Sequence, residues 1–141
     1  MKAAASPMAD SPRPASYVIL SVDPEKATFL DTGGRSEHML ANLGDTRLAV
    51  KAKCSDNNLY RVNPVYIYIE PGQCHNLLIS RLPGPPKNDK LVLHYIQVKE
   101  PASDIKEVFK NSSSTDTIKI PMLCLSHEDV PVIGNAVAEK K

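Results

Sequence analysis

Features typical of proteins that bind DNA, cross membranes or leave the cell are missing from this 141-residue sequence. Lys and Arg number 17 against 16 Asp and Glu, so the chain lacks the basic excess with which nucleic-acid-binding proteins displace counterions. No apolar run approaches the roughly 20 residues that span a bilayer; the best is Val65–Ile69. Met1–Ser16 has no continuous apolar stretch of the kind found in a secretory signal. We therefore expect no nucleic-acid partner, no transmembrane segment and no secretion.

Cysteine is also sparse. The three residues, Cys54, Cys74 and Cys124, are an odd number with no repeated spacing. A secreted disulfide framework normally shows an even, denser set. We therefore expect reduced thiols in a cytosolic protein.

Catalytic and metal-binding motifs are missing as well. There is no P-loop and no GxGxxG, and Gly33-Gly34 is typical of a turn. Cys74 and His75 are neighbours in a predicted strand and would project to opposite faces, which does not suit a nucleophile and its base. The other histidines lack ligand spacing: His38, His94 and His127. We expect no enzyme, no bound metal and no cofactor.

The chain length fits one domain, and a hydrophobic content of 42% with 23% charged residues is that of an ordinary globular protein. Met1–Ser16 is rich in Ala, Ser and Pro and has too few large apolar residues to offset its ordering entropy, so we predict a disordered tail. Ser126–Lys141 is predicted to be a second, flexible tail. The ordered domain is expected over residues 17–125.

Alternation of apolar and polar residues runs through that domain and predicts strands. In Arg47–Cys54 the apolar Leu48 and Val50 point one way while Lys51 and Lys53 point the other, which gives an apolar inside and a basic outside. Further strands are predicted at Tyr17–Asp23, Ala27–Leu30, Ser36–Asn42, Leu59–Val62, Val65–Glu70, Gln73–Leu82, Lys90–Val98 and Asp116–Leu125. The expected core residues are Val18, Leu20, Val22, Leu48, Val50, Leu77, Ile79, Ile118 and Ile120.

Turn residues separate these strands, as in Glu70-Pro71-Gly72. Asn63-Pro64 predicts a bend whose cis or trans state the sequence leaves open, and Pro121 predicts an edge position or a bulge. Ser103–Lys110 has helical spacing and a capping residue at Ser103. Seven to nine short strands with one short helix predict an all-β, immunoglobulin-like sandwich.

The surface offers one candidate for binding. Lys51 and Lys53 leave the sheet on one side, followed closely by Asn57 and Asn58. Two interpretations stay open, a solvated strand face or a docking strip for an acidic or hydroxyl-bearing partner. Exposed sheet edges also invite strand addition by another chain.

Two adjoining stretches make the sequence similar to a known family. Leu48–Ser55 followed by Leu59–Pro64 resembles the central motif of the major sperm protein domain: alternating apolar residues and lysines, two small residues, then Tyr, Val and Pro at fixed spacing. Glu70-Pro71-Gly72 resembles the turn that follows this motif, and Lys87–Val92 resembles the charged loop before a late strand. The resemblance spans about residues 17–125 and is strongest to nematode sperm-specific class P proteins and fibre-associated proteins.

The resemblance implies a seven-stranded immunoglobulin-like sandwich without enzymatic activity, located in the cytoplasm. It implies a component or regulator of the major sperm protein filaments that drive crawling of the sperm pseudopod. Its partners would be those filaments or other sperm cytoskeletal proteins. The Pro83–Pro86 loop and the absence of Trp depart from major sperm protein itself, which favours an accessory role.

A second branch of the family, the VAMP-associated proteins, uses the same fold to bind acidic peptide segments. Lys51, Lys53 and Lys90 match basic positions of that groove, which makes an adaptor domain the alternative function. Cys54 stands where that branch has Thr, and Val92 where it has Met. Asp116 lies near a position where it has a further Lys.

Overall fold

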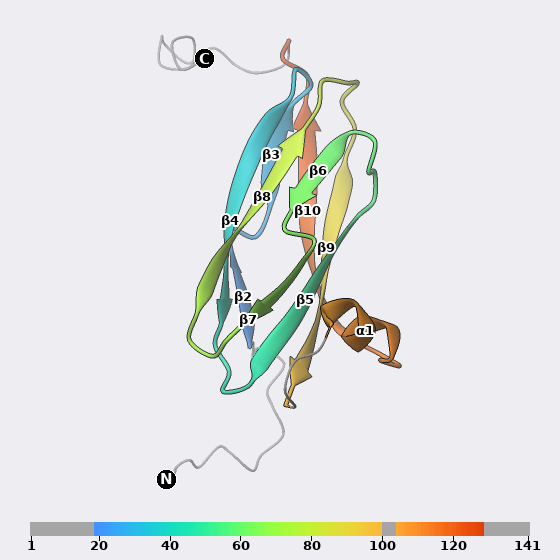
Figure 1. The fold of residues 1–141 in the computed structure, drawn as a ribbon. Coiled ribbons are helices and arrows are strands. Elements are labelled where there is room, and N and C mark those ends of the chain that lie inside the picture. Colours follow the sequence, from blue (N-terminus) through green and yellow to red (C-terminus); the bar gives the residue numbers. More distant parts are fainter. Residues whose placement is uncertain (1–18, 100–103, 129–141) are drawn as a thin grey trace.

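The computed structural model describes residues 19–99 and 104–128. The first sheet has five strands in the order β3-β10-β9-β5-β7, and the second has four in the order β2-β4-β8-β6. The two sheets face each other as the layers of a sandwich (Figure 1). The strands are β2 Leu20–Asp23, β3 Ala27–Leu30, β4 Gly34–Asn42, β5 Arg47–Cys54, β6 Tyr60–Asn63, β7 Tyr66–Ile69, β8 Cys74–Arg81, β9 Asp89–Val98 and β10 Asp116–Leu125. The predicted fold class is confirmed.

Nine assigned strands correspond to the seven of the immunoglobulin-like fold because two strands each divide between the sheets. β2 pairs with β4 in one sheet, and β3 continues the chain alongside β10 in the other. In the same way β6 pairs with β8, and β7 pairs with β5. Each division falls at a proline, Pro24 or Pro64, and both X-Pro bonds are cis. The bend predicted at Asn63-Pro64 is thus a change of sheet.

The core lies between the sheets and is built from the inward side chains of the alternating strands. Of the predicted core residues, seven are buried and Ile118 is half-buried against the core cluster, while Val18 lies outside the described residues. Leu20, Ile79 and Ile120 have no exposed surface. Burying a side chain of this size stabilises the fold by about 1.5–3 kcal/mol relative to leaving it in water.

Pro121 lies in β10, an interior strand of the five-stranded sheet. β10 pairs with β9 over Asp116–Met122 but with β3 only from Met122 onward. Over residues 116–121, therefore, β10 has one strand partner among the described residues. A proline lacks the N–H needed for a second ladder, so this local edge is where β10 tolerates it.

The helix α1 spans Ile105–Lys110. Its N-cap is Asp104, whose side chain accepts a hydrogen bond from the Lys106 N–H at 3.1 Å. The prediction of Ser103 as the cap was one residue early; Asp is at least as good an N-cap as Ser, and the apolar spacing does not fix the first turn. Phe109 packs against Tyr66 of β7, with ring centroids 6.0 Å apart. α1 thus covers the β7 end of the outer face of the five-stranded sheet.

The turn Glu70-Pro71-Gly72 forms as predicted. The Gln73 N–H donates to the Glu70 carbonyl at 3.0 Å, and Gly72 has φ +78°, which an L side chain would adopt only with strain. The Gly72 N–H donates to Asn42, a buried residue whose side chain bonds Thr46, Ile69 and Gly44. One asparagine thereby fixes the loops at this end of the sandwich.

Candidate partner-binding face

The lysines of β5 lie on the outer face of the five-stranded sheet, as the alternation predicted. Lys51 is paired with His94 of β9, and Lys53 with Val92. Residues directly opposite each other in an antiparallel pair share a face. Ala49 also faces outward but is fully buried, because the larger Ile96 and Tyr68 lie opposite it on the neighbouring strands.

Two further lysines belong to the same surface. Lys90 lies two residues from Val92 in β9, so the two side chains share a face. Lys119 of β10 is paired with Val92 from the other side. We call Lys51, Lys53, Lys90 and Lys119 the basic face.

The basic face has no carboxylate partner within the described parts of the chain, since the ion pairs there involve other cations. Lys53, Lys90 and Lys119 are exposed. Lys51 is half-buried, and its Nζ lies 5.8 Å from the centroid of the Tyr66 ring. Lys106 of α1 lies 5.7 Å from the same centroid, so a fifth ammonium group borders the face. Such a surface attracts anions.

His94 lies between the strands that carry these lysines. Its Nδ1 is 3.0 Å from Thr115 Oγ1, just before β10. Burial lowers the pKa of His94, and the charges of Lys51 and Lys53 lower it further. The electrostatic potential of the basic face therefore acts on a titratable ring that lies directly beside Lys51.

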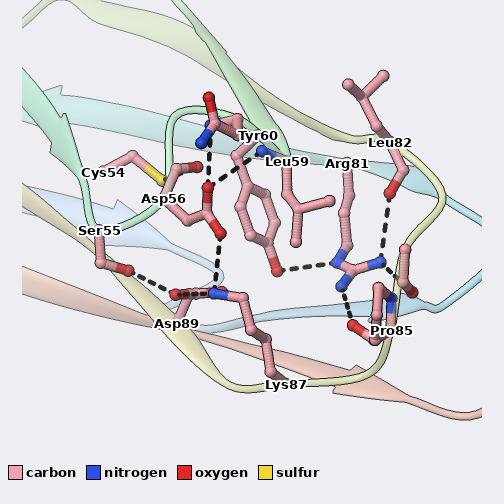
Figure 2. A network of polar contacts seen from close by, with 12 residues as sticks. Cys54, Ser55, Asp56, Leu59, Tyr60, Arg81, Leu82, Pro85, Lys87 and Asp89 are labelled. Atoms are coloured by element: carbon pink, nitrogen blue, oxygen red, sulfur yellow. Dashed lines mark hydrogen bonds and ion pairs between the residues drawn. The ribbon is translucent and has the colours of Figure 1, made fainter.

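Asn57 and Asn58 lie in an exposed turn after β5 that Asp56 organises. Asp56 Oδ1 accepts the N–H groups of Asn58 and Leu59 at 2.9 and 3.2 Å. Lys87 Nζ reaches Asp56 at 2.9 Å and Asp89 at 2.8 Å, as Figure 2 shows. The hydrogen bond from Lys87 lowers the pKa of Asp56, and the two carboxylates raise the pKa of Lys87. Both asparagines are thus held on a fixed turn.

The structure brings Asn57 and Lys53 together but not Asn58. A groove of about 370 Å³ lies between the end of β5 and β6. Its polar lining residues are Lys53, Asn57 and Arg61, and Tyr60 and Val62 are among the apolar ones. Asn58 lies in the same turn and does not line this groove. Arg61 is partly engaged, donating from Nη1 to the Asn57 carbonyl at 2.6 Å.

A different cation, Arg81, contacts the Pro83–Pro86 loop. Arg81 is 3% exposed and donates to the Tyr60 hydroxyl at 3.2 Å. Its remaining bonds reach the carbonyl oxygens of Leu82, Gly84 and Pro85 (Figure 2). Tyr60, itself buried, packs edge-on against Phe29 with ring centroids 5.3 Å apart. This buried guanidinium holds the loop onto the sandwich.

The remaining reactive side chains do not form a site. Cys74 is exposed at the start of β8, and its neighbour His75 is half-buried. None of the three cysteines is in a disulfide; the Cys54 thiol donates to the Asp56 carbonyl at 3.5 Å, and burial raises its pKa. His38 is buried with Nδ1 2.7 Å from the Pro24 carbonyl and Nε2 2.8 Å from Ser36 Oγ. Within residues 19–99 and 104–128, no three His, Cys, Asp or Glu side chains are grouped to hold a metal ion.

Lys119, Lys106 and His94 belong to or border this candidate face and were not predicted from the sequence. Lys119 alternates with Ile118 and Ile120, so a two-residue period could have marked it as outward. The two-residue period does not predict that β9 pairs with β10 and so places Lys119 beside Val92. The sequence-based candidates Lys51, Lys53 and Lys90 do share one face.

Comparison with known proteins places the chain in one family. The family model described as "MSP (Major sperm protein) domain" matches residues 19–117. Sperm-specific class P protein 34 of Caenorhabditis elegans is 38% identical over 105 residues, which cover 74% of this chain and 98% of that protein.

Two solved structures from the same nematode agree. WR4, described as a major sperm protein family member, superposes with a TM-score of 0.73 at 36% identity, covering 77% of this chain and 100% of that one. SSP-19, described as a major sperm protein domain protein-like family member, gives 0.70 at 35% identity over 74% of this chain and 97% of that one. No helix among the described residues is long and apolar enough to cross a bilayer.

Proposed function

This chain belongs to the major sperm protein domain family, and on that premise we propose that it is a non-enzymatic component or regulator of the nematode sperm cytoskeleton. It acts in the cytoplasm of the pseudopod, on the major sperm protein filaments that drive crawling. The similarity to sperm-specific class P proteins supports this role.

The basic face is the observation that carries the proposal. Four lysines on three neighbouring strands share one surface and lack ion-pair partners in the described residues. Unpaired surface cations contribute little to folding, whereas a partner bearing carboxylates would form several charge-assisted contacts with them. We propose that Lys51, Lys53 and Lys90, with Lys119, dock the protein onto an acidic surface of a filament subunit. Asn57, at the adjacent groove, and Asn58 add hydrogen bonds.

The test compares filament growth with and without the protein. A Lys51→Glu, Lys53→Glu variant reverses two charges on the face; Lys26→Glu with Lys99→Glu reverses two exposed charges elsewhere. The first variant should lose its effect on growth rate and its co-sedimentation with filaments, while the control retains both. Binding by the parent protein should also weaken as salt rises, since exposed charge pairs are screened. If both variants are equally active, the basic face does not bind the filament and is only a solvated surface.

An adaptor function is the second candidate, since Lys51, Lys53 and Lys90 also match basic positions of the VAMP-associated branch. Their placement on one face supports binding of an extended acidic peptide across β5 and β9. Cys54 and Val92 depart from that branch at the positions where it has Thr and Met. A pull-down with acidic peptides carrying paired phenylalanines discriminates the two functions: retention of the peptide without any effect on filaments favours the adaptor.

A further inference from the structure

The loop between α1 and β10 carries four consecutive hydroxyl side chains beside the basic face. These are Ser112, Ser113, Ser114 and Thr115. Ser113 and Ser114 are exposed, and Ser112 Oγ donates to the Ser114 carbonyl at 2.7 Å. The segment therefore presents hydroxyl groups at the surface, on a short turn outside the regular strand pairing.

Thr115 connects this loop to the lysines. Its Oγ1 lies 3.0 Å from His94 Nδ1, and His94 is directly opposite Lys51 in the β5–β9 pair. Thr117 of β10, two residues further on, is paired with His94 from the other side. Thr115 therefore adjoins the outer face next to Lys51, whereas the acidic neighbour Asp116 faces the opposite way by strand alternation.

We propose that Thr115 is a phosphorylation site whose phosphate occupies the basic face and competes with the acidic partner. A protein kinase would transfer the γ-phosphoryl group of a nucleoside triphosphate to Thr115 Oγ1. The bond to the β-phosphate oxygen breaks, the nucleoside diphosphate leaves, and the hydroxyl proton passes to the kinase's base and then to solvent. This inference rests on the proposed function, because it names the regulation of the same surface.

The chemistry of a phosphate suits this location. A phosphothreonine carries about −1.5 to −2 charges at pH 7 and three strong acceptor oxygens. Held at residue 115, it would accept from the His94 ring, which already lies within hydrogen-bond distance of Oγ1. Lys51, directly opposite His94, and Lys53, two residues further along the same face of β5, would form its ion pairs. Because the group is tethered, it competes at a high effective concentration against any partner in solution.

The first experiment tests the intramolecular contact without a partner. The chain is prepared with phosphothreonine at position 115 or, as the matched control, phosphoserine at the exposed position 113 of the same loop. ³¹P NMR titration should give a lower second phosphate pKa at 115 than at 113. The difference should shrink when Lys51→Gln and Lys53→Gln are added, leaving the part due to His94. Equal pKa values at 115 and 113 would overturn the proposal.

The second experiment measures competition, with a fluorescein-labelled peptide of ten glutamates as the probe. Phosphorylation at 115 should weaken its binding about fivefold, the size of one or two exposed ion pairs, and phosphorylation at 113 by much less. Thr115→Ala, which removes the hydroxyl without adding charge, should leave binding unchanged. If the unmodified chain neither binds acidic probes nor affects filaments, the proposed function is wrong. If it binds normally and phosphate at residue 115 does not change the binding, only the phosphorylation proposal is wrong.

Occupancy of the site is checked on protein isolated from the cells that make it. Trypsin cleaves after Lys110 and Lys119, which releases residues 111–119 as one peptide. Fragment-ion mapping should localise a phosphate to Thr115. A peptide that is always unmodified at this residue would contradict the proposal.

Discussion

Cations occur in this molecule in two contrasting settings. Arg81 and Lys87 are each engaged by several oxygen atoms and hold the loops around Pro83–Pro86 and Asp56. The lysines of the basic face lie on a regular sheet surface with no carboxylate partner in the described residues. A cation whose bonds are all made inside the fold contributes to stability, and one left unpaired on a rigid sheet is available to another molecule. The two groups should therefore respond to mutation in opposite ways.

The largest effect is expected at Arg81. Arg81→Met keeps much of the apolar stem but leaves the Tyr60 hydroxyl and three loop carbonyls without their donor. Unsatisfied buried polar groups cost about 1–3 kcal/mol each; because the loop can partly turn its carbonyls to water, we expect a loss of about 2–4 kcal/mol in total. Urea denaturation followed by circular dichroism measures it. Arg35→Met, at an exposed position, serves as the control and should change stability by less than about 0.5 kcal/mol.

The orientation of the lysines in β5 could be predicted from the sequence, whereas the contacts of Arg81 could not. Alternation alone predicts β5 and β10 with the bounds observed, because a strand period of two assigns every side chain to a face. The same period placed Lys51 and Lys53 outward. Arg81 follows the inward period of Leu77 and Ile79, but we did not predict its burial, and its partners come from the next loop and from β6. Contacts between elements distant in sequence are not encoded in a local period.

Lys119, His94 and the Asp104 cap were missed for related reasons. The position of Lys119 beside Val92 depends on the β9–β10 register, which a sequence period does not determine. Asp104 and Ser103 are both adequate caps on local chemistry, so the sequence does not decide between them. Sequence reasoning thus identified the strip on one strand, and the neighbouring strands widened it into a surface.

A small effect on stability is expected when the basic face is altered. Lys51→Glu with Lys53→Glu should change the free energy of unfolding by no more than about 0.5 kcal/mol per site, since these lysines make no ion pair within the described chain. The same double variant should lose partner binding, as proposed above. Both quantities should be measured on one preparation. If the free energy of unfolding falls by several kcal/mol, the lysines are structural like Arg81, and the contrast between the two groups of cations is wrong.

The most delicate comparison concerns His94, which reports the potential of the basic face. Its pKa lies below the usual 6.5 because of burial and then of Lys51 and Lys53, so the folded state favours the neutral ring. The unfolded chain binds a proton more readily, so the stability contributed by neutral His94 is present above about pH 6.5. That contribution is lost as pH falls through the unfolded pKa and then the folded one.

NMR titration of the imidazole should show the His94 pKa rising toward its ordinary value in Lys51→Met, Lys53→Met, with the remaining difference due to burial. An acidic peptide bound to the parent protein should raise the pKa in the same direction, since its carboxylates offset the lysines and favour the charged ring. A His94 pKa that ignores both the substitutions and the peptide would show that the lysine charges are screened by solvent at this distance. Partner binding at the basic face should then leave no trace on His94.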